Sequence, residues 1–98
     1  MRIPEEKLHE AIDAHGEARD LLDIHYPKAN KRFEKIVSNL NKLIREVQKT
    51  FPDANYYLAN DTLNLMLGPS HASGCNQMPN SEFVAVYAHI DCASGGDW

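Results

Sequence analysis

Four side chains in the second half of the sequence are of the types that bind zinc: His71, Cys75, His89 and Cys92. Zinc prefers thiolate sulfurs and imidazole nitrogens in a tetrahedral arrangement. The spacings here, H-x3-C and H-x2-C, do not match the usual zinc fingers, and His89 falls inside a predicted strand. We therefore favour two ordinary thiols and two histidines without a metal, and keep a small zinc-binding protein as an alternative.

The other candidate reactive residues lack the partners that catalysis needs. Cys75 and His71 could act as nucleophile and base, but no third group that would orient them can be identified. Glu6 and His9 have the Glu-x-x-His spacing of di-iron bundles without a second inward-facing copy. His15 lies on the apolar arc of a predicted helix, where it is either a pH-sensitive switch or, as we favour, a packed neutral histidine. We predict a protein that is not an enzyme and has no cofactor.

The stretch from Asn30 to Phe51 predicts a long amphipathic helix. Its apolar residues recur at steps of three and four, from Phe33 through Leu40 to Phe51. We expect this stripe to face inward while the opposite, basic arc stays in water. That arc is the candidate nucleic-acid surface, and it consists of Lys31, Lys35, Lys42, Arg45 and Lys49. We favour a solvated face, partly neutralised by acidic residues of the preceding helix, over a nucleic-acid site.

Charge is strongly segregated along the 98 residues. Residues 1–26 carry seven acidic and three basic side chains, for −4, and residues 27–50 carry seven basic and two acidic ones, for +5. Residues 51–98 carry five acidic side chains and no Lys or Arg, for −5. Acidic surfaces repel nucleic acid or imitate it, and Tyr and Trp are enriched where proteins meet. The predicted partner-binding residues are Glu10, Asp13, Glu17, Asp20, Tyr56, Tyr87 and Trp98.

These residues are positioned by an α+β fold, which we expect to form a single domain over residues 1–98. The pattern predicts helices over about 4–25 and 30–51, strands over about 55–59, 62–67 and 82–90, and a flexible tail over 93–98. Pro27 ends the first helix, and Asn60-Asp61 joins the first two strands as a hairpin. The predicted architecture is an N-terminal antiparallel two-helix hairpin packed on a C-terminal three-stranded antiparallel sheet.

The last predicted strand, residues 82–90, is apolar on both faces. One face is expected to meet the helices and the other a partner subunit, so we predict a homodimer. No run of the sequence approaches the roughly 20 apolar residues of a membrane span, and the start, MRIPEEKLHE, lacks the apolar core of a signal peptide. With only two cysteines, we expect reduced thiols and a cytoplasmic protein.

Three segments within residues 61–98, D-T-L-N-L-M-L-G-P-S-H, F-V-A-V and G-G-D-W, resemble small accessory proteins encoded by bacteriophages and prophages. The resemblance implies a protein that acts in the cytoplasm of a bacterial host by binding a host protein or complex, often as an inhibitor of host defence. It carries over no functional residues. We therefore predict a non-enzymatic protein-binding accessory protein that acts through its acidic and aromatic surface, with the nucleic-acid-binding module and the zinc protein as alternatives.

Overall fold

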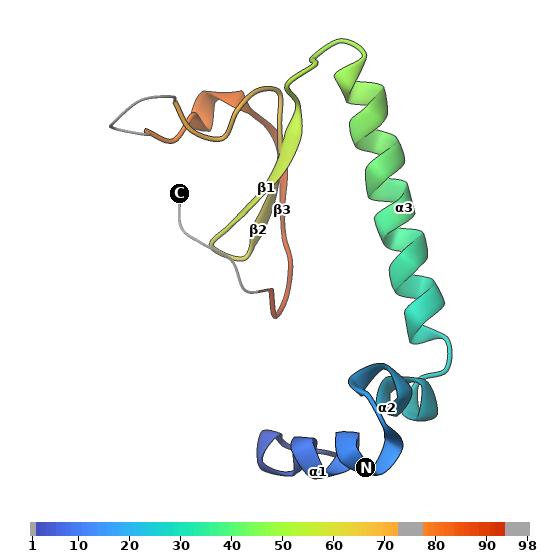
Figure 1. Ribbon diagram of the computed structural model, residues 1–98. Helices are drawn as coiled ribbons and strands as arrows, with labels where there is room; N and C mark the ends of the chain where they lie inside the picture. Colours follow the sequence, from blue (N-terminus) through green and yellow to red (C-terminus); the bar gives the residue numbers. More distant parts are fainter. Residues whose placement is uncertain (1, 73–77, 94–98) are drawn as a thin grey trace. The chain divides into compact units, whose positions relative to one another are not determined.

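Three helices precede a three-stranded antiparallel sheet in the computed structural model, which describes residues 2–72 and 78–93 (Figure 1). The elements are α1 (Glu5–His15), α2 (Ala18–His25), α3 (Ala29–Gln48), β1 (Asn55–Ala59), β2 (Thr62–Met66), a 3-10 helix η1 (Ser81–Phe83) and β3 (Val84–His89). The α+β class is as predicted. The chain divides into two units, Met1–Asn39 and Leu40–Trp98, which are described one at a time; the single domain stays a prediction.

The helix expected over residues 4–25 is divided at Gly16, so the predicted two-helix hairpin is not confirmed. Gly16 has a φ of 108°, which favours glycine because a Cβ would be strained there. The next helix begins with a capping box in which the backbone N–H of Glu17 donates to Oδ2 of Asp20 over 3.1 Å. α2 then ends at His25, two residues before Pro27, as the proline predicted.

α3 is one unbroken helix of 20 residues that belongs to the first unit at its start and to the second at its end. It begins and ends within three residues of the predicted helix over 30–51. Leu40, Ile44 and Val47 are half-buried, but Phe33 and Ile36 are 69% and 59% exposed. The prediction that the whole apolar stripe faces inward is therefore wrong for the first half of α3, where little of the described chain covers it.

The β1–β2 hairpin has the turn that the sequence predicted. Asn60 and Asp61 both have positive φ, 51° and 60°, which is the backbone of a type I′ hairpin turn and which Asn and Asp tolerate. β2 is the central strand and pairs antiparallel with β1 and β3 in the order β1-β2-β3. The strands expected over 62–67 and 82–90 are slightly shorter than predicted.

The pairing of β2 with β3 contains a β-bulge. Leu65 lies opposite Val86, whereas the next residue, Met66, lies opposite Val84. Ala85 is therefore an extra residue in β3 without a partner in the register.

The core of the second unit lies on the face of the sheet that carries Met66, Asn64 and Ala59. Met66 is 0% exposed, and the other two are also buried. The Asn64 amide donates hydrogen bonds of 3.1 Å to the carbonyl oxygens of Tyr57 and Thr62, so this buried polar group is satisfied.

The segment between β2 and β3 folds back onto this buried face. The His71 ring meets the Tyr57 ring edge-on with centroids 5.4 Å apart, and Tyr57 lies opposite Asn64 in the register. Gly68 is so close to Phe83 that an added Cβ would lie 3.0 Å from its ring. These contacts place both ends of the connection between β2 and β3 over the core, so part of this connection packs as the core does.

Candidate functional site

The four acidic residues predicted to bind a partner are all exposed on α1, α2 and the turn between them, within the unit Met1–Asn39. Glu17 and Asp20 hold the capping box of α2, so their side chains already have a structural role. Glu10 and Asp13 lie on α1 and remain on the surface. All four acidic residues are therefore accessible, two of them already serve the helix terminus, and their role in partner binding stays a prediction.

The predicted aromatic residues have different environments in the unit Leu40–Trp98. Tyr56 is half-buried, and its hydroxyl donates to the carbonyl oxygen of Leu40 over 2.8 Å. Burial raises the pKa of Tyr56 above its usual 10.0. Tyr87 is 71% exposed on β3. Trp98 lies outside the described residues.

Of the alternative zinc ligands His71, Cys75, His89 and Cys92, Cys75 lies outside the described residues. Among residues 2–72 and 78–93, no three His, Cys, Asp or Glu side chains come together as a metal site. The His71 Nδ1 atom lies 3.0 Å from the Ser70 hydroxyl oxygen, and the His89 Nε2 atom lies 3.4 Å from Oδ1 of Asp91 on the surface. Cys92 is a free, exposed thiol. The described residues give the zinc alternative no support.

The histidine predicted on the apolar arc of the first helix is on the surface. His15 is exposed at the last residue of α1, immediately before the break at Gly16. Both expectations for it, a buried switch and a packed neutral ring, are therefore wrong. The physical reason is the break itself, because the helix ends before the arc can continue past His15. Glu6 and His9 are exposed as well.

The basic residues predicted along α3 are all exposed: Lys31, Lys35, Lys42, Arg45 and Lys49. Within the described part of the chain, the ion pair found is His89 with Asp91, and no carboxylate lies within salt-bridge distance of these five side chains. The neutralisation by acidic residues of the first helix, which the sequence suggested, is therefore not made by direct ion pairs there.

An apolar groove of about 290 Å³ opens in the unit Leu40–Trp98, on the sheet face opposite the core. It is lined by Leu40, Leu43, Tyr56, Leu63, Leu65, Val86, Tyr87 and Ala88, and none of these is charged. The volume is near the lower end of the range for ligand pockets. Val86, which is one of the lining residues, is 60% exposed, so the groove extends to the edge strand β3 and is open there.

The outer edge of β3 is the second notable feature of this unit. Among the described residues, β3 pairs with β2 alone, so its other edge has backbone N–H and C=O groups without a strand partner. The strand, VAVYAH, contains neither lysine nor proline, the residues that commonly protect such edges. Exposed carboxylates of Glu82 and Asp91 stand just before and just after β3. The edge is therefore open, apolar and flanked by negative charge.

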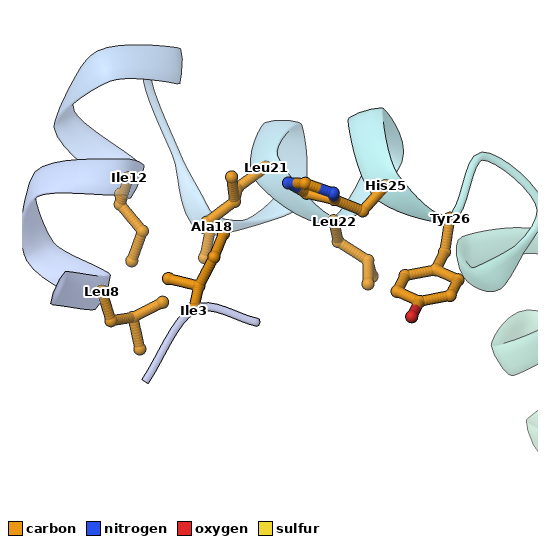
Figure 2. A pocket seen from close by; sticks show the side chains of 8 residues that line it. All are labelled: Ile3, Leu8, Ile12, Ala18, Leu21, Leu22, His25 and Tyr26. Carbon is orange, nitrogen blue, oxygen red and sulfur yellow. The ribbon is translucent and has the colours of Figure 1, made fainter. Parts of the chain in front are cut away.

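A separate apolar groove of about 310 Å³ lies in the unit Met1–Asn39. Figure 2 shows the side chains that line it, from the chain start, α1, α2 and the residue after α2: Ile3, Leu8, Ile12, Ala18, Leu21, Leu22, His25 and Tyr26. The apolar spacing of Leu8, Ile12 and Leu22 was visible in the sequence. The sequence did not predict the turn at Gly16. This turn divides the expected helix into α1 and α2, and residues from both helices line the groove.

No family model, curated protein or solved structure matches this chain. Within the described residues, none of the helices has the length and apolar character required to cross a bilayer.

Proposed function

We propose that the chain is a non-enzymatic protein-binding protein that captures an extended segment of a partner protein along the outer edge of β3. The observation that carries this proposal is the unprotected edge of β3 beside the apolar groove. In this mode of recognition, the guest strand forms main-chain hydrogen bonds with the edge while its alternate side chains fill neighbouring pockets.

The chemistry of the guest follows from what surrounds β3. Alternate side chains of an added strand would reach the groove beside Val86, which favours apolar residues at every second position. The carboxylates of Glu82 and Asp91 at the two ends of β3 favour Lys or Arg on both sides of the apolar core of the guest. The partner class is therefore a protein with an accessible apolar stretch flanked by basic residues.

The resemblance to phage accessory proteins supplies the biological setting of the proposal. It makes the partner a protein of a bacterial host, for example a component of a defence complex whose basic surface binds nucleic acid. The acidic side chains of Glu10 and Asp13 and the exposed Tyr87 support that setting, because they suit a basic partner surface.

Selection from a library of displayed random peptides tests this function with the full chain. We expect enriched peptides to carry alternating apolar residues between basic ones, and their binding to slow amide hydrogen exchange at residues 84–89. V86K, which places a charge at the groove, should abolish the binding. I24K changes an exposed residue of α2 in the same way and should bind as the wild type does. Absence of enriched peptides, or peptides that bind without protecting β3, would contradict the proposal.

A nucleic-acid-binding module is the second candidate, favoured by one observation. The basic side chains of α3 are exposed and lie beyond salt-bridge distance of any described carboxylate, so they are available to phosphates. Titration with duplex DNA by fluorescence anisotropy tests it. Affinity should fall steeply with salt and should drop in a K35E/K42E variant. A DNA affinity that does not change with salt concentration, or no binding at low salt, would contradict this alternative.

A further inference from the structure

The unit Met1–Asn39 has too little core to be stable by itself. Leu21 is its one buried residue among residues 2–39. Segments below about 40 residues usually need a disulfide, a metal or oligomerisation to fold. Cys75 and Cys92 are both in the other unit, so no disulfide can form within this one, and no metal site was found among its described residues. Oligomerisation is a way to complete its core.

The groove of this unit is an incomplete core that lacks one apolar layer. Figure 2 shows the side chains of α1 and α2 that line it, together with Ile3 and Tyr26. Leu8, Leu22 and Tyr26 are exposed although they line the groove. The helices that form it belong to residues 1–26, which carry a net charge of −4. A complementary occupant is therefore a helix that has an apolar face and a net positive charge.

The first half of α3 has these properties. Phe33, Ile36 and Val37 follow one another at helical spacing and are exposed on one face, so they do not fill the groove of their own chain. Residues 27–39, which hold this face, carry a net charge of +3, although Lys31 and Lys35 lie on the opposite arc of the helix: Lys28, Lys31, Arg32 and Lys35, against Glu34. The first unit therefore contains an apolar groove in a segment of net charge −4 and an exposed apolar helix face in a segment of net charge +3.

We propose that two copies of the chain form a symmetric dimer in which the first half of α3 of each copy occupies the α1–α2 groove of the other. A two-fold axis makes such a contact reciprocal: residue i of one copy meets residue j of the other, and the reverse. The dimer covers the exposed Phe33, Ile36 and Leu22 and brings together two segments of opposite net charge. This inference concerns the first unit and is independent of the peptide-binding edge of β3.

Light scattering after size-exclusion chromatography gives the first test. At micromolar concentrations we expect a mass of twice the 11.1 kDa chain, and a dissociation constant that rises with salt because the two segments brought together carry opposite net charges. F33D on the helix face and L22D in the groove should each weaken the dimer by about a hundredfold or more, as expected for interface anchors. A wild-type chain that stays monomeric would overturn the proposal.

Mixing the two variants tests the reciprocal arrangement itself. Each variant alone has no intact groove–helix contact, but the mixed pair restores one, between the groove of F33D and the helix of L22D. We therefore expect a heterodimer from the mixture and monomers from each variant alone. If the L22D chain remains a dimer, α3 pairs with α3 and the groove assignment is wrong; if mixing restores nothing, the exchange is wrong.

Two controls separate this result from misfolding and from the proposed function. I24D places the same charge on the same helix, at an exposed residue outside the groove lining, and should remain a dimer. Circular dichroism must show unchanged helix content in each variant; if L22D loses helix, Y26S, at an exposed groove residue, replaces it. V86K should abolish peptide capture and leave the dimer intact, so the experiments can contradict the peptide-binding proposal and the dimer proposal independently of each other. A monomeric I24D would overturn the groove assignment.

Discussion

The phenolic hydroxyl of Tyr56, in β1, donates a 2.8 Å hydrogen bond to the backbone carbonyl oxygen of Leu40, in α3. Gln48 adds a second link near the other end of this half of α3, since its side-chain amide donates to the Ala54 carbonyl oxygen over 2.9 Å. Between the two links, Ile44 and Val47 are half-buried. These polar contacts therefore attach the second half of α3 to the strands within the unit Leu40–Trp98.

Removing the Tyr56 hydroxyl should lower stability modestly and change its dependence on pH. Y56F should lose about 1 kcal/mol in urea unfolding near neutral pH, the usual net value of one hydrogen bond. Because burial raises the Tyr56 pKa in the folded state, the folded chain holds this proton more tightly than the unfolded chain. The contribution is thus complete below pH 10 and is lost as pH rises through the raised pKa. Wild-type stability should fall there more steeply than that of Y56F; parallel curves would contradict the assignment.

Truncating the buried methionine of the sheet should be far more damaging than truncating an exposed one. M66A removes the side chain that is 0% exposed in the core of the second unit, and should cost about 2–5 kcal/mol through lost burial and a residual cavity. M78A changes an exposed methionine of the same unit and should stay within about 0.5 kcal/mol of the wild type. Urea unfolding of the two variants compares them. Equal losses would mean that Met66 is not the centre of this core.

The turn between α1 and α2 should depend on glycine. A Cβ at Gly16 would lie 2.9 Å from Oδ2 of Asp20, and the φ of 108° is strained for any residue with a side chain. We expect G16A to cost about 1–3 kcal/mol and to lower amide protection in residues 5–25. In a D20A background the clash is absent and only the backbone strain remains, so the cost of G16A should shrink. An unchanged cost would assign the whole effect to backbone conformation.

The sequence predicted the secondary structure well where a local chemical signal was unambiguous. Pro27 marked the end of the second helix, Asn60-Asp61 marked the hairpin, and the periodicity after Asn30 marked α3. Gly16 was missed because one glycine within an amphipathic pattern does not by itself end a helix. The signal that could have found the break was Glu17 with Asp20, which have the spacing of a capping box but were interpreted as partner-binding residues.

Burial was predicted less well than secondary structure, for a physical reason. Periodicity tells which residues share a face and does not tell what covers that face. Phe33 and Ile36 have the same pattern as Leu40, yet only Leu40 is half-buried. Met66 is buried because the connection holding Gly68 and Phe83 folds over its face, and that contact joins residues far apart in the chain. Both grooves depend on such tertiary contacts, so the sequence could suggest apolar arcs but not the sites.

The extra residue in β3 has a consequence for how far assembly at this edge can extend. A strand that is bent and twisted by a bulge at Ala85 cannot continue as the flat, regular template on which layer after layer of identical segments stacks into a fibril. Only the four residues after the bulge, Val86 to His89, keep an uninterrupted register. A guest strand that pairs with this edge as proposed should therefore be short, and further growth of the sheet beyond it is disfavoured.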